Sequence, residues 1–228
     1  MSSAGITRVL PFGASEERKG PMAWNKQKGV TLLELMTVVA ITMIVTGVGF
    51  ITLHPMLKKS HMDSGYDTTL MVLRNTRNLA ITQSHEYYVN FNPGGFPAGT
   101  IQVQYQPPAV GGGAAPPLQQ VSTYAIPADV NFAVLPGFPT AAPDGFGTGA
   151  NGIDFGQNLA GAPMKYVVFM PDGSSRDSVG NFNNGVIYLS PADGDIYNTR
   201  AITVWGSTGR VRGWNLSKVA GTATWVQQ

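Results

Sequence analysis

The stretch Lys28-Gly29-Val30-Thr31-Leu32-Leu33-Glu34-Leu35 opens a long apolar run, residues 30–53, which reads VTLLELMTVVAITMIVTGVGFITL. The run contains 24 residues and a single ionisable side chain, Glu34. A helix rises about 1.5 Å per residue, so this run is long enough to cross a bilayer core of roughly 30 Å. It predicts a transmembrane helix, because the apolar region of an ordinary secretory signal peptide is shorter.

Basic residues are concentrated before the apolar run. Up to Gly29 the chain has five basic and two acidic side chains, whereas from Val30 onward it has ten basic and eleven acidic ones. Lys26 and Lys28 directly precede the run, so the positive-inside rule places the N-terminus in the cytoplasm and the residues after His54 in the periplasm. The sequence pI of 8.9 therefore reflects the first 29 residues and indicates no general affinity for nucleic acid.

Glu34 is the unusual residue of the run. A carboxylate inside an apolar span costs about 2.5–3.5 kcal/mol on insertion scales, so it either has a partner or extends to the membrane interface. Its position alone leaves both interpretations open.

The string from Lys28 to Leu35 resembles the class III signal of type IV prepilins. The resemblance implies that a prepilin peptidase cuts after Gly29 and that Val30 becomes the methylated N-terminus. It also implies that Glu34 attracts the Val30 amine of a neighbouring subunit and so sets the register of a filament. Two features depart from the family pattern: Val30 stands where phenylalanine is usual, and Pro55 comes about one helical turn late.

Residues 1–29 are interpreted as the cytoplasmic leader. Type IV leaders are commonly short, and MAWNKQKG, from Met22 to Gly29, is a complete eight-residue leader. Met22 is therefore an alternative start to Met1, in which case residues 1–21 have no structural role.

After residue 53 the apolar positions indicate an amphipathic helix over residues 54–86, continuous with the membrane span. Apolar or long side chains recur every three or four residues, which predicts one face packed on a sheet. These residues are Met62, Tyr66, Leu70, Leu73, Arg77 and Ile81.

Residues 87–228 are predicted to form a β-rich periplasmic domain. Charged residues make up only 12% of the chain, which has 28 glycines and 16 prolines, a composition that favours strands and turns. The predicted strands are 87–91, 100–106, 120–125, 130–135, 165–170, 186–190, 201–205 and 211–216. A long helix followed by short strands predicts an α+β fold with antiparallel sheet. The Gly/Pro-rich stretches 107–117 and 136–152 are interpreted as flexible surface insertions, in preference to partner-binding loops.

Residues 73–91 resemble the segment of GspH/FimT-type minor pseudopilins in which the spine helix enters the first strand. The stretches 167–174, 185–189 and 200–211 add to this likeness, although Thr76 stands where alanine is common. The resemblance implies a pilin-like fold and a minor subunit that initiates or caps a filament. Its implied partners are other pseudopilins or pilins, the prepilin peptidase and the inner membrane.

No catalytic constellation is visible in the sequence. The chain has no cysteine, and no serine or carboxylate is spaced with His54, His61 or His85 as in a triad. No phosphate-binding glycine loop or metal-ligand pair occurs, so we predict neither an enzyme nor a cofactor nor a metal site. Asp193-Gly194-Asp195 offers oxygens to calcium, but a plain turn is the favoured interpretation because further spaced acidic ligands are missing.

Residues 200–228 carry four basic side chains and no acid, among three tryptophans. Arg210 and Arg212 belong to a Gly-Arg-Val-Arg string that resembles the Gly-Arg-x-Arg string of FimT-like members associated with DNA uptake. These two arginines are therefore candidate nucleic-acid contacts. We favour the alternative that they are solvated while the tryptophans pack inward. The predicted function is a structural minor subunit of a type II secretion pseudopilus; the alternative is a minor type IV pilin that binds DNA.

Overall fold

The computed structural model describes residues 29–92, 94–109, 111, 114–139, 141–156 and 164–228, without the side chains of residues 48–54. Residues 1–28 of the predicted leader 1–29, including the alternative start at Met22, fall outside these ranges, as do residues 110, 112, 113 and 140 of the two Gly/Pro-rich stretches. The chain divides into two compact units between Val48 and Gly49. The predicted α+β class with antiparallel sheets is confirmed.

Helix α1 comprises Leu32–Gln83, where the sequence predicted helix over residues 30–86. Pro55 lies inside it and provides no backbone N–H for the helical ladder. The helix ends at Ser84, which adopts a positive φ of 56° and so turns the chain out of the helix. Among the described residues, no helix combines the length and the apolar character needed to cross a membrane.

One face of α1 is buried in the second unit. The predicted positions Met62, Tyr66 and Leu73 are buried, but the stripe continues through small side chains, and Ile81 is 40% exposed. The remaining buried helix residues are Gly65, Thr69, Val72, Thr76 and Ala80. The sequence prediction weighted large apolar residues and therefore missed the small ones that let α1 approach the strands.

The first sheet has five strands in the order β3-β2-β1-β6-β7, with every described pairing antiparallel. Alternate side chains of β1 are buried, as expected for a sheet with one face on the core. The strands are β1 Glu86–Phe91, β2 Thr100–Gln106, β3 Gln119–Ala125, β6 Tyr166–Phe169 and β7 Ser175–Arg176.

The second sheet has the order β11-β10-β9-β8-β4, and β5 also pairs with β8. Strand β8 pairs with β9 on one side and with β4 and β5 on the other. It is buried along its whole length because side chains from its two faces belong to two different apolar cores. The strands are β4 Val130–Phe132, β5 Ile153–Phe155, β8 Gly185–Pro191, β9 Arg200–Trp205, β10 Arg210–Val219 and β11 Thr222–Gln227.

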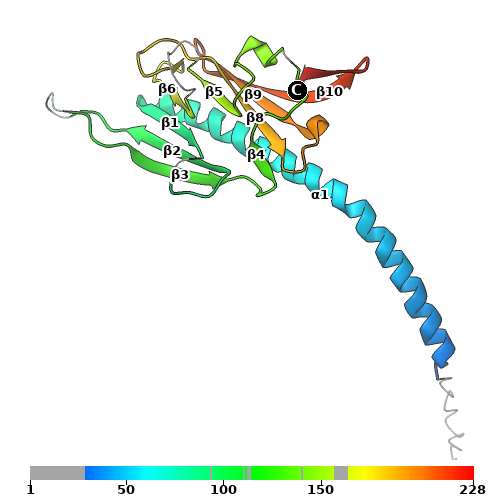
Figure 1. Ribbon diagram of the computed structural model, residues 1–228. Coiled ribbons are helices and arrows are strands. Elements are labelled where there is room, and N and C mark those ends of the chain that lie inside the picture. Colours follow the sequence, from blue (N-terminus) through cyan, green and yellow to red (C-terminus); the bar gives the residue numbers. More distant parts are fainter. Residues whose placement is uncertain (1–28, 93, 110, 112–113, 140, 157–163) are drawn as a thin grey trace, which may run out of the picture. The chain divides into compact units, whose positions relative to one another are not determined.

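The main core lies between α1 and both sheets, and Figure 1 shows this part of the helix running between them. It contains Leu73 of the helix, Phe91 and Phe169 of the first sheet, and Leu189 and Ile202 of the second, all fully or almost fully buried. The helix therefore provides the apolar surface that each sheet needs to cover its inner face.

A second core covers the opposite face of the second sheet. Phe146, Val186, Tyr188 and Ala201 are buried there, with Trp205, Trp214 and Trp225 packed against them. The tryptophans thus pack inward, as the favoured interpretation expected.

The stretch 136–152 supplies the cover of this second core. Phe138 packs on Tyr188 and Trp225, with ring centroids 5.5 Å apart in both pairs, and Phe146 meets Trp205 edge to face at 5.0 Å. A short 3-10 helix, Pro143–Gly145, lies between these two phenylalanines. These contacts hold Phe138 and Phe146 against the sheet, a packing that the interpretation of this stretch as a flexible surface insertion did not include. The interpretation used the Gly/Pro composition of the stretch and gave no weight to the two aromatic side chains that hold it to the sheet.

The stability of the second core should depend on pH through Tyr188. Burial, together with the nearby Asp154 carboxylate, raises the pKa of Tyr188 from 10 to about 12. The folded pKa exceeds the unfolded one, so the stabilising contribution of the neutral phenol is complete below pH 10 and is lost as the pH rises towards 12. Two pKa units correspond to about 2–3 kcal/mol. The thermal midpoint of the full chain in detergent micelles should therefore fall between pH 9 and pH 11.5 by less in Tyr188→Phe than in the wild type.

Tyr197→Phe is the matched control, because Tyr197 is 42% exposed and its ionisation does not have to occur inside a core. It should follow the wild type. Equal losses in wild type and Tyr188→Phe would show that the phenol of Tyr188 ionises without hindrance in the folded state.

Candidate functional site

The first candidate site is the start of α1. Thr31 caps the helix: its Oγ1 accepts a hydrogen bond from the Glu34 backbone N–H at 3.2 Å, and its carbonyl accepts from Leu35 N at 3.1 Å. Thr31 and Glu34 have the Thr-x-x-Glu spacing of a capping box. The string that resembles a processing signal is thus also the local signal that begins the helix.

Val30 and Glu34 are both accessible at this helix start. Val30 is 69% exposed, Gly29 has no neighbour within 4 Å of the Cβ that another residue would add, and the Glu34 side chain is exposed. A carboxylate in the first turn is favoured by the partial positive charge of the helix N-terminus. Within the described residues the Glu34 carboxylate accepts no hydrogen bond from its own chain, so it is available to a cation on another molecule.

The second candidate site is the hairpin of β9 and β10, which carries Arg210 and Arg212. Arg210 is exposed at the start of β10. Arg212 instead donates from Nη1 to Asp144 Oδ1 at 2.9 Å, and its guanidinium lies 5.0 Å from the centroid of the Trp205 ring. The two arginines that the sequence grouped together therefore have different environments.

Asp144, in the stretch 136–152 that covers the second core, fixes the position of Arg212 beside Trp205. Its other oxygen, Oδ2, accepts from Thr203 Oγ1 at 2.6 Å and from Trp205 Nε1 at 3.0 Å. The Asp144 side chain is only 7% exposed, and its φ of 54° is one that aspartate tolerates better than most residues. The Asp144 carboxylate therefore neutralises Arg212 and joins the stretch to β9 and β10.

Arg200 is neutralised in the same way by a residue of α1. It donates from Nη2 to Asp63 Oδ1 at 2.9 Å and from Nη1 to Asn215 Oδ1 at 2.9 Å. Its side chain is 7% exposed. Two of the four basic residues of the segment 200–228 are thus engaged by acids from elsewhere in the chain.

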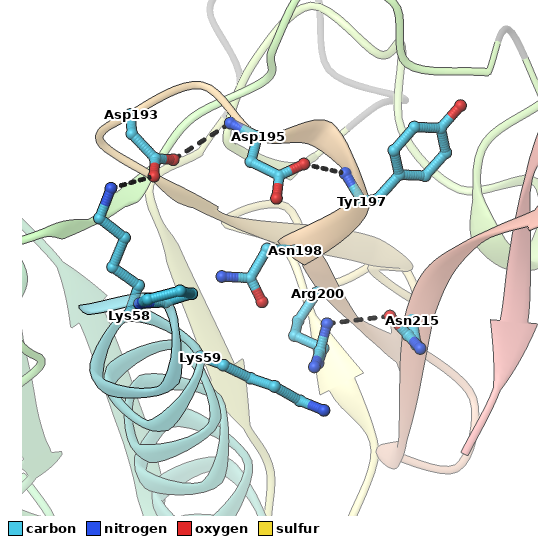
Figure 2. Close-up of a pocket in the computed structure, with 9 residues that line it drawn as sticks. Lys58, Lys59, Asp193, Asp195, Tyr197, Asn198, Arg200 and Asn215 are labelled. Carbon is cyan, nitrogen blue, oxygen red and sulfur yellow. Dashed lines mark hydrogen bonds and ion pairs between the residues drawn. The ribbon is translucent and has the colours of Figure 1, made fainter. Parts of the chain in front are cut away.

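Arg200 also lines a hollow of about 510 Å³ between α1, the loop after β8, and strands β9 and β10. Figure 2 shows Lys58 and Lys59 entering it from the helix, with Asp193 and Asp195 on the loop above them. Lys58 Nζ donates to Asp193 Oδ2 at 2.8 Å, and this bond holds the pKa of Asp193 below its ordinary value. The Lys58 and Asp193 charges largely cancel.

The Asp193-Gly194-Asp195 string forms a turn. Asp193 Oδ1 accepts from the Asp195 backbone N–H, and Asp195 caps a short 3-10 helix, Ile196–Asn198, by accepting from Tyr197 N. Within the described ranges, no group of three or more His, Asp or Glu side chains is placed to hold a metal ion. Three of the four carboxylate oxygens of Asp193 and Asp195 thus accept hydrogen bonds, two of them within this turn and one from Lys58.

Sequence reasoning gave His61 no acidic partner, but the structure provides one. His61 Nδ1 lies 2.9 Å from Asp129 Oδ2, and both side chains are about half exposed. His85 packs near Tyr105, with ring centroids 6.0 Å apart, while the His54 side chain falls outside the described atoms. Among described residues the His61–Asp129 pair has no further hydrogen-bonded member that would extend it to a triad.

Comparisons with known proteins support the N-terminal assignment. Residues 24–50 match the family described as the prokaryotic N-terminal methylation motif, which confirms the resemblance to type IV pilin-like precursors over this segment. A search of the curated proteins found no match.

Two solved structures are similar to the chain. One is the minor pseudopilin EpsH from the type 2 secretion system of Vibrio cholerae, with a TM-score of 0.40 and 10% identity, covering 66% of this chain and 93% of that one. The other is the type IV minor pilin FimU of Pseudomonas aeruginosa strain PAO1, with a TM-score of 0.41 and 10% identity, covering 75% of this chain and 97% of that one.

The role of Asp144 can be tested by substitution. Asp144→Ala removes the acceptor for Arg212, Trp205 and Thr203, and should lower the free energy of unfolding by about 2–4 kcal/mol. Asp144→Asn should cost less, because it keeps an acceptor oxygen and tolerates the positive φ. Urea unfolding of the full chain in detergent micelles, followed by tryptophan fluorescence, measures both.

Asp67→Ala is the control, since Asp67 is exposed on α1 and should change stability by less than about 0.5 kcal/mol. A double-mutant cycle with Arg212→Gln should show a coupling energy above about 0.5 kcal/mol. Additive effects of the two substitutions would contradict the assigned ion pair.

Proposed function

We propose that this chain is the precursor of a type IV pilin-like subunit that a prepilin peptidase processes after Gly29 and that assembles into a bacterial envelope filament. The observation that carries the proposal is the methylation motif at residues 24–50, together with an accessible Gly29–Val30 bond at the start of α1. Within that class we favour a minor pseudopilin that initiates or caps a type II secretion pseudopilus.

The apolar run 30–53 is proposed to anchor the subunit in the inner membrane, with its N-terminus in the cytoplasm and its β-rich unit in the periplasm. Lys26 and Lys28 before the run support this orientation. The run includes residues 48–53, whose side chains the structure does not describe. Its support is therefore the sequence of the run, with one ionisable residue in 24.

Assembly is proposed to use the pair formed by Glu34 and a new amine. Cleavage after Gly29 gives Val30 a positively charged N-terminus that the precursor lacks. Two opposite charges in an apolar environment relieve each other's desolvation, so the Val30 amine of one subunit and the Glu34 carboxylate of the next attract each other strongly. The accessible Glu34 carboxylate makes this contact available between subunits and fixes their axial register.

The second unit is proposed to be a structural body and not an enzyme. Its polar clusters include three ion pairs, Arg212 with Asp144, Arg200 with Asp63 and Lys58 with Asp193. Each pair joins segments distant in sequence, which is a stabilising role. This supports a rigid subunit surface for contacts with neighbouring filament proteins.

The alternative, a minor pilin that binds DNA through Arg210 and Arg212, has less support. Because Asp144 neutralises the charge of Arg212, the attraction of Arg212 for a phosphate is weaker than that of an arginine without an acidic partner. Arg210 is exposed, so of the two arginines it is the one available for a contact with DNA.

Processing is the first test. When the full chain is co-expressed with a prepilin peptidase, it should shift to a smaller product, and Gly29→Arg should prevent the shift because it replaces the glycine after which the proposed cut is made. Immunoblotting against the C-terminus measures both. Gly47→Arg would not be an informative control because it adds a charge to the span; Gly94→Arg, in an open loop, should be processed normally. Equal cleavage of Gly29→Arg would overturn the proposed site.

Assembly is the second test. Glu34→Gln keeps the shape of the side chain but removes its charge, so insertion should be at least as efficient, whereas incorporation into filaments should drop at least about tenfold. Membrane fractionation and quantification of sheared filaments measure the two steps separately. Asp67→Asn, an equal loss of charge on the exposed face of α1, should behave as the wild type. Normal incorporation of Glu34→Gln into filaments would show that the Glu34 charge does not set the register of the subunits.

A further inference from the structure

A groove of about 500 Å³ lies where the C-terminal part of α1 meets the turn between β9 and β10. The helix contributes Arg74, Arg77 and Asn78, and the turn and the start of β10 contribute Thr208, Gly209, Arg210 and Val211. Three arginines therefore line one hollow, although they come from segments more than 130 residues apart. The filament role proposed above does not use this groove.

Arg77 is held in place at the base of the groove. Its Nε donates to the carbonyl of Gly173 at 3.2 Å and to that of Thr208 at 3.0 Å. A Cβ on Gly209 would lie 2.9 Å from Arg77 Nε, and one on Gly173 would lie 3.1 Å from its Nη2. Both glycines also have positive φ, of 60° and 80°, which favours glycine over other residues. The guanidinium is thus preorganised, while within the described residues its Nη1 and Nη2 atoms make no hydrogen bond.

Arg74 and Arg210 flank Arg77 and are both exposed. No acidic side chain lines the groove, and within the described part of the chain none of the three arginines takes part in an ion pair. This distinguishes them from Arg176, Arg200 and Arg212, each of which has an aspartate partner. The groove therefore concentrates positive charge that the described part of the fold leaves uncompensated.

We infer that this groove is a binding site for a phosphate-class oxyanion, formed jointly by Arg74, Arg77 and Arg210. Guanidinium groups donate paired hydrogen bonds that match phosphate and carboxylate oxygens. A carboxylate offers two oxygens and one charge, whereas a phosphate offers three or four oxygens and up to two charges. A groove lined by three arginines therefore favours phosphate.

The membrane is an unsuitable source of this phosphate. Arg74 lies 21 residues after Leu53 along α1, which corresponds to about 30 Å of helix. A lipid headgroup at the end of the proposed membrane span is out of reach over that distance. The candidates are a free phosphate compound and the phosphodiester backbone of a nucleic acid, which share the recognised chemistry.

Calorimetric titration of the full chain, in nonionic detergent micelles at low salt, tests the site with inorganic pyrophosphate as the probe. Pyrophosphate should bind, and Arg74→Gln and Arg210→Gln should each weaken binding about tenfold, since each removes a charge-assisted contact. Lys218→Gln removes the same charge from an exposed position at the far end of β10 and should bind as the wild type. Arg77→Gln is not used alone, because Arg77 also holds two turns.

Two further arms identify the source and the specificity. A labelled 12-base-pair DNA duplex, measured by fluorescence anisotropy, reports polymer phosphate: loss of its binding in Arg74→Gln and Arg210→Gln assigns the groove to a nucleic-acid backbone, and its absence beside pyrophosphate binding assigns it to a free phosphate compound. Acetate is the carboxylate comparison, with two oxygens and one charge, and should bind at least about tenfold more weakly than pyrophosphate. The site is rejected if neither phosphate probe binds, if Lys218→Gln weakens binding as much as the groove variants do, or if acetate binds equally well.

Discussion

The packing of one helix face between two sheets is the constraint on which the second unit depends. Each sheet has an apolar inner face that needs a cover, and the stripe of α1 from Met62 to Ala80 provides it for both. Full burial of a large apolar side chain contributes about 1.5–3 kcal/mol, so the cluster on this stripe far outweighs any single polar contact. The close approach is possible because the facing positions are small: a Cβ on Gly65 would meet Val130 at 3.3 Å, and the Tyr66 hydroxyl occupies the space beside Gly213.

The distribution of charge follows from this packing. Once α1 and the stretch 136–152 are in place, Asp63 reaches Arg200 and Asp144 reaches Arg212, so two of the four positive charges of the segment 200–228 gain an acidic partner. The same docking brings Arg74 and Arg77 beside Arg210. Among the described residues, Arg200 and Arg212 therefore have acidic partners, whereas the three arginines that line the groove have none. Only the tertiary structure produces this distribution of charge.

Local patterns predicted the helix, the α+β class and eight strands, because helical and strand periodicity are properties of short windows. They missed three strands: β5 and β7 are short, and β11 was overlooked although Ala220-Gly221 is a turn followed by alternating Thr222–Gln227. The ion pairs were out of reach, since Asp144 and Arg212 are 68 residues apart and Asp63 and Arg200 are 137 apart. For the same reason the sequence grouped Arg210 with its neighbour Arg212, whereas its partners in space are on α1.

Processing and assembly as proposed both require a mature chain that begins at Val30. Tandem mass spectrometry of the N-terminal peptide, on protein purified from native membranes, identifies this residue. We expect a peptide that begins with N-methylated Val30 and contains Glu34. A peptide that retains Gly29 and earlier residues, or a mature terminus beyond Leu53, would contradict this proposal.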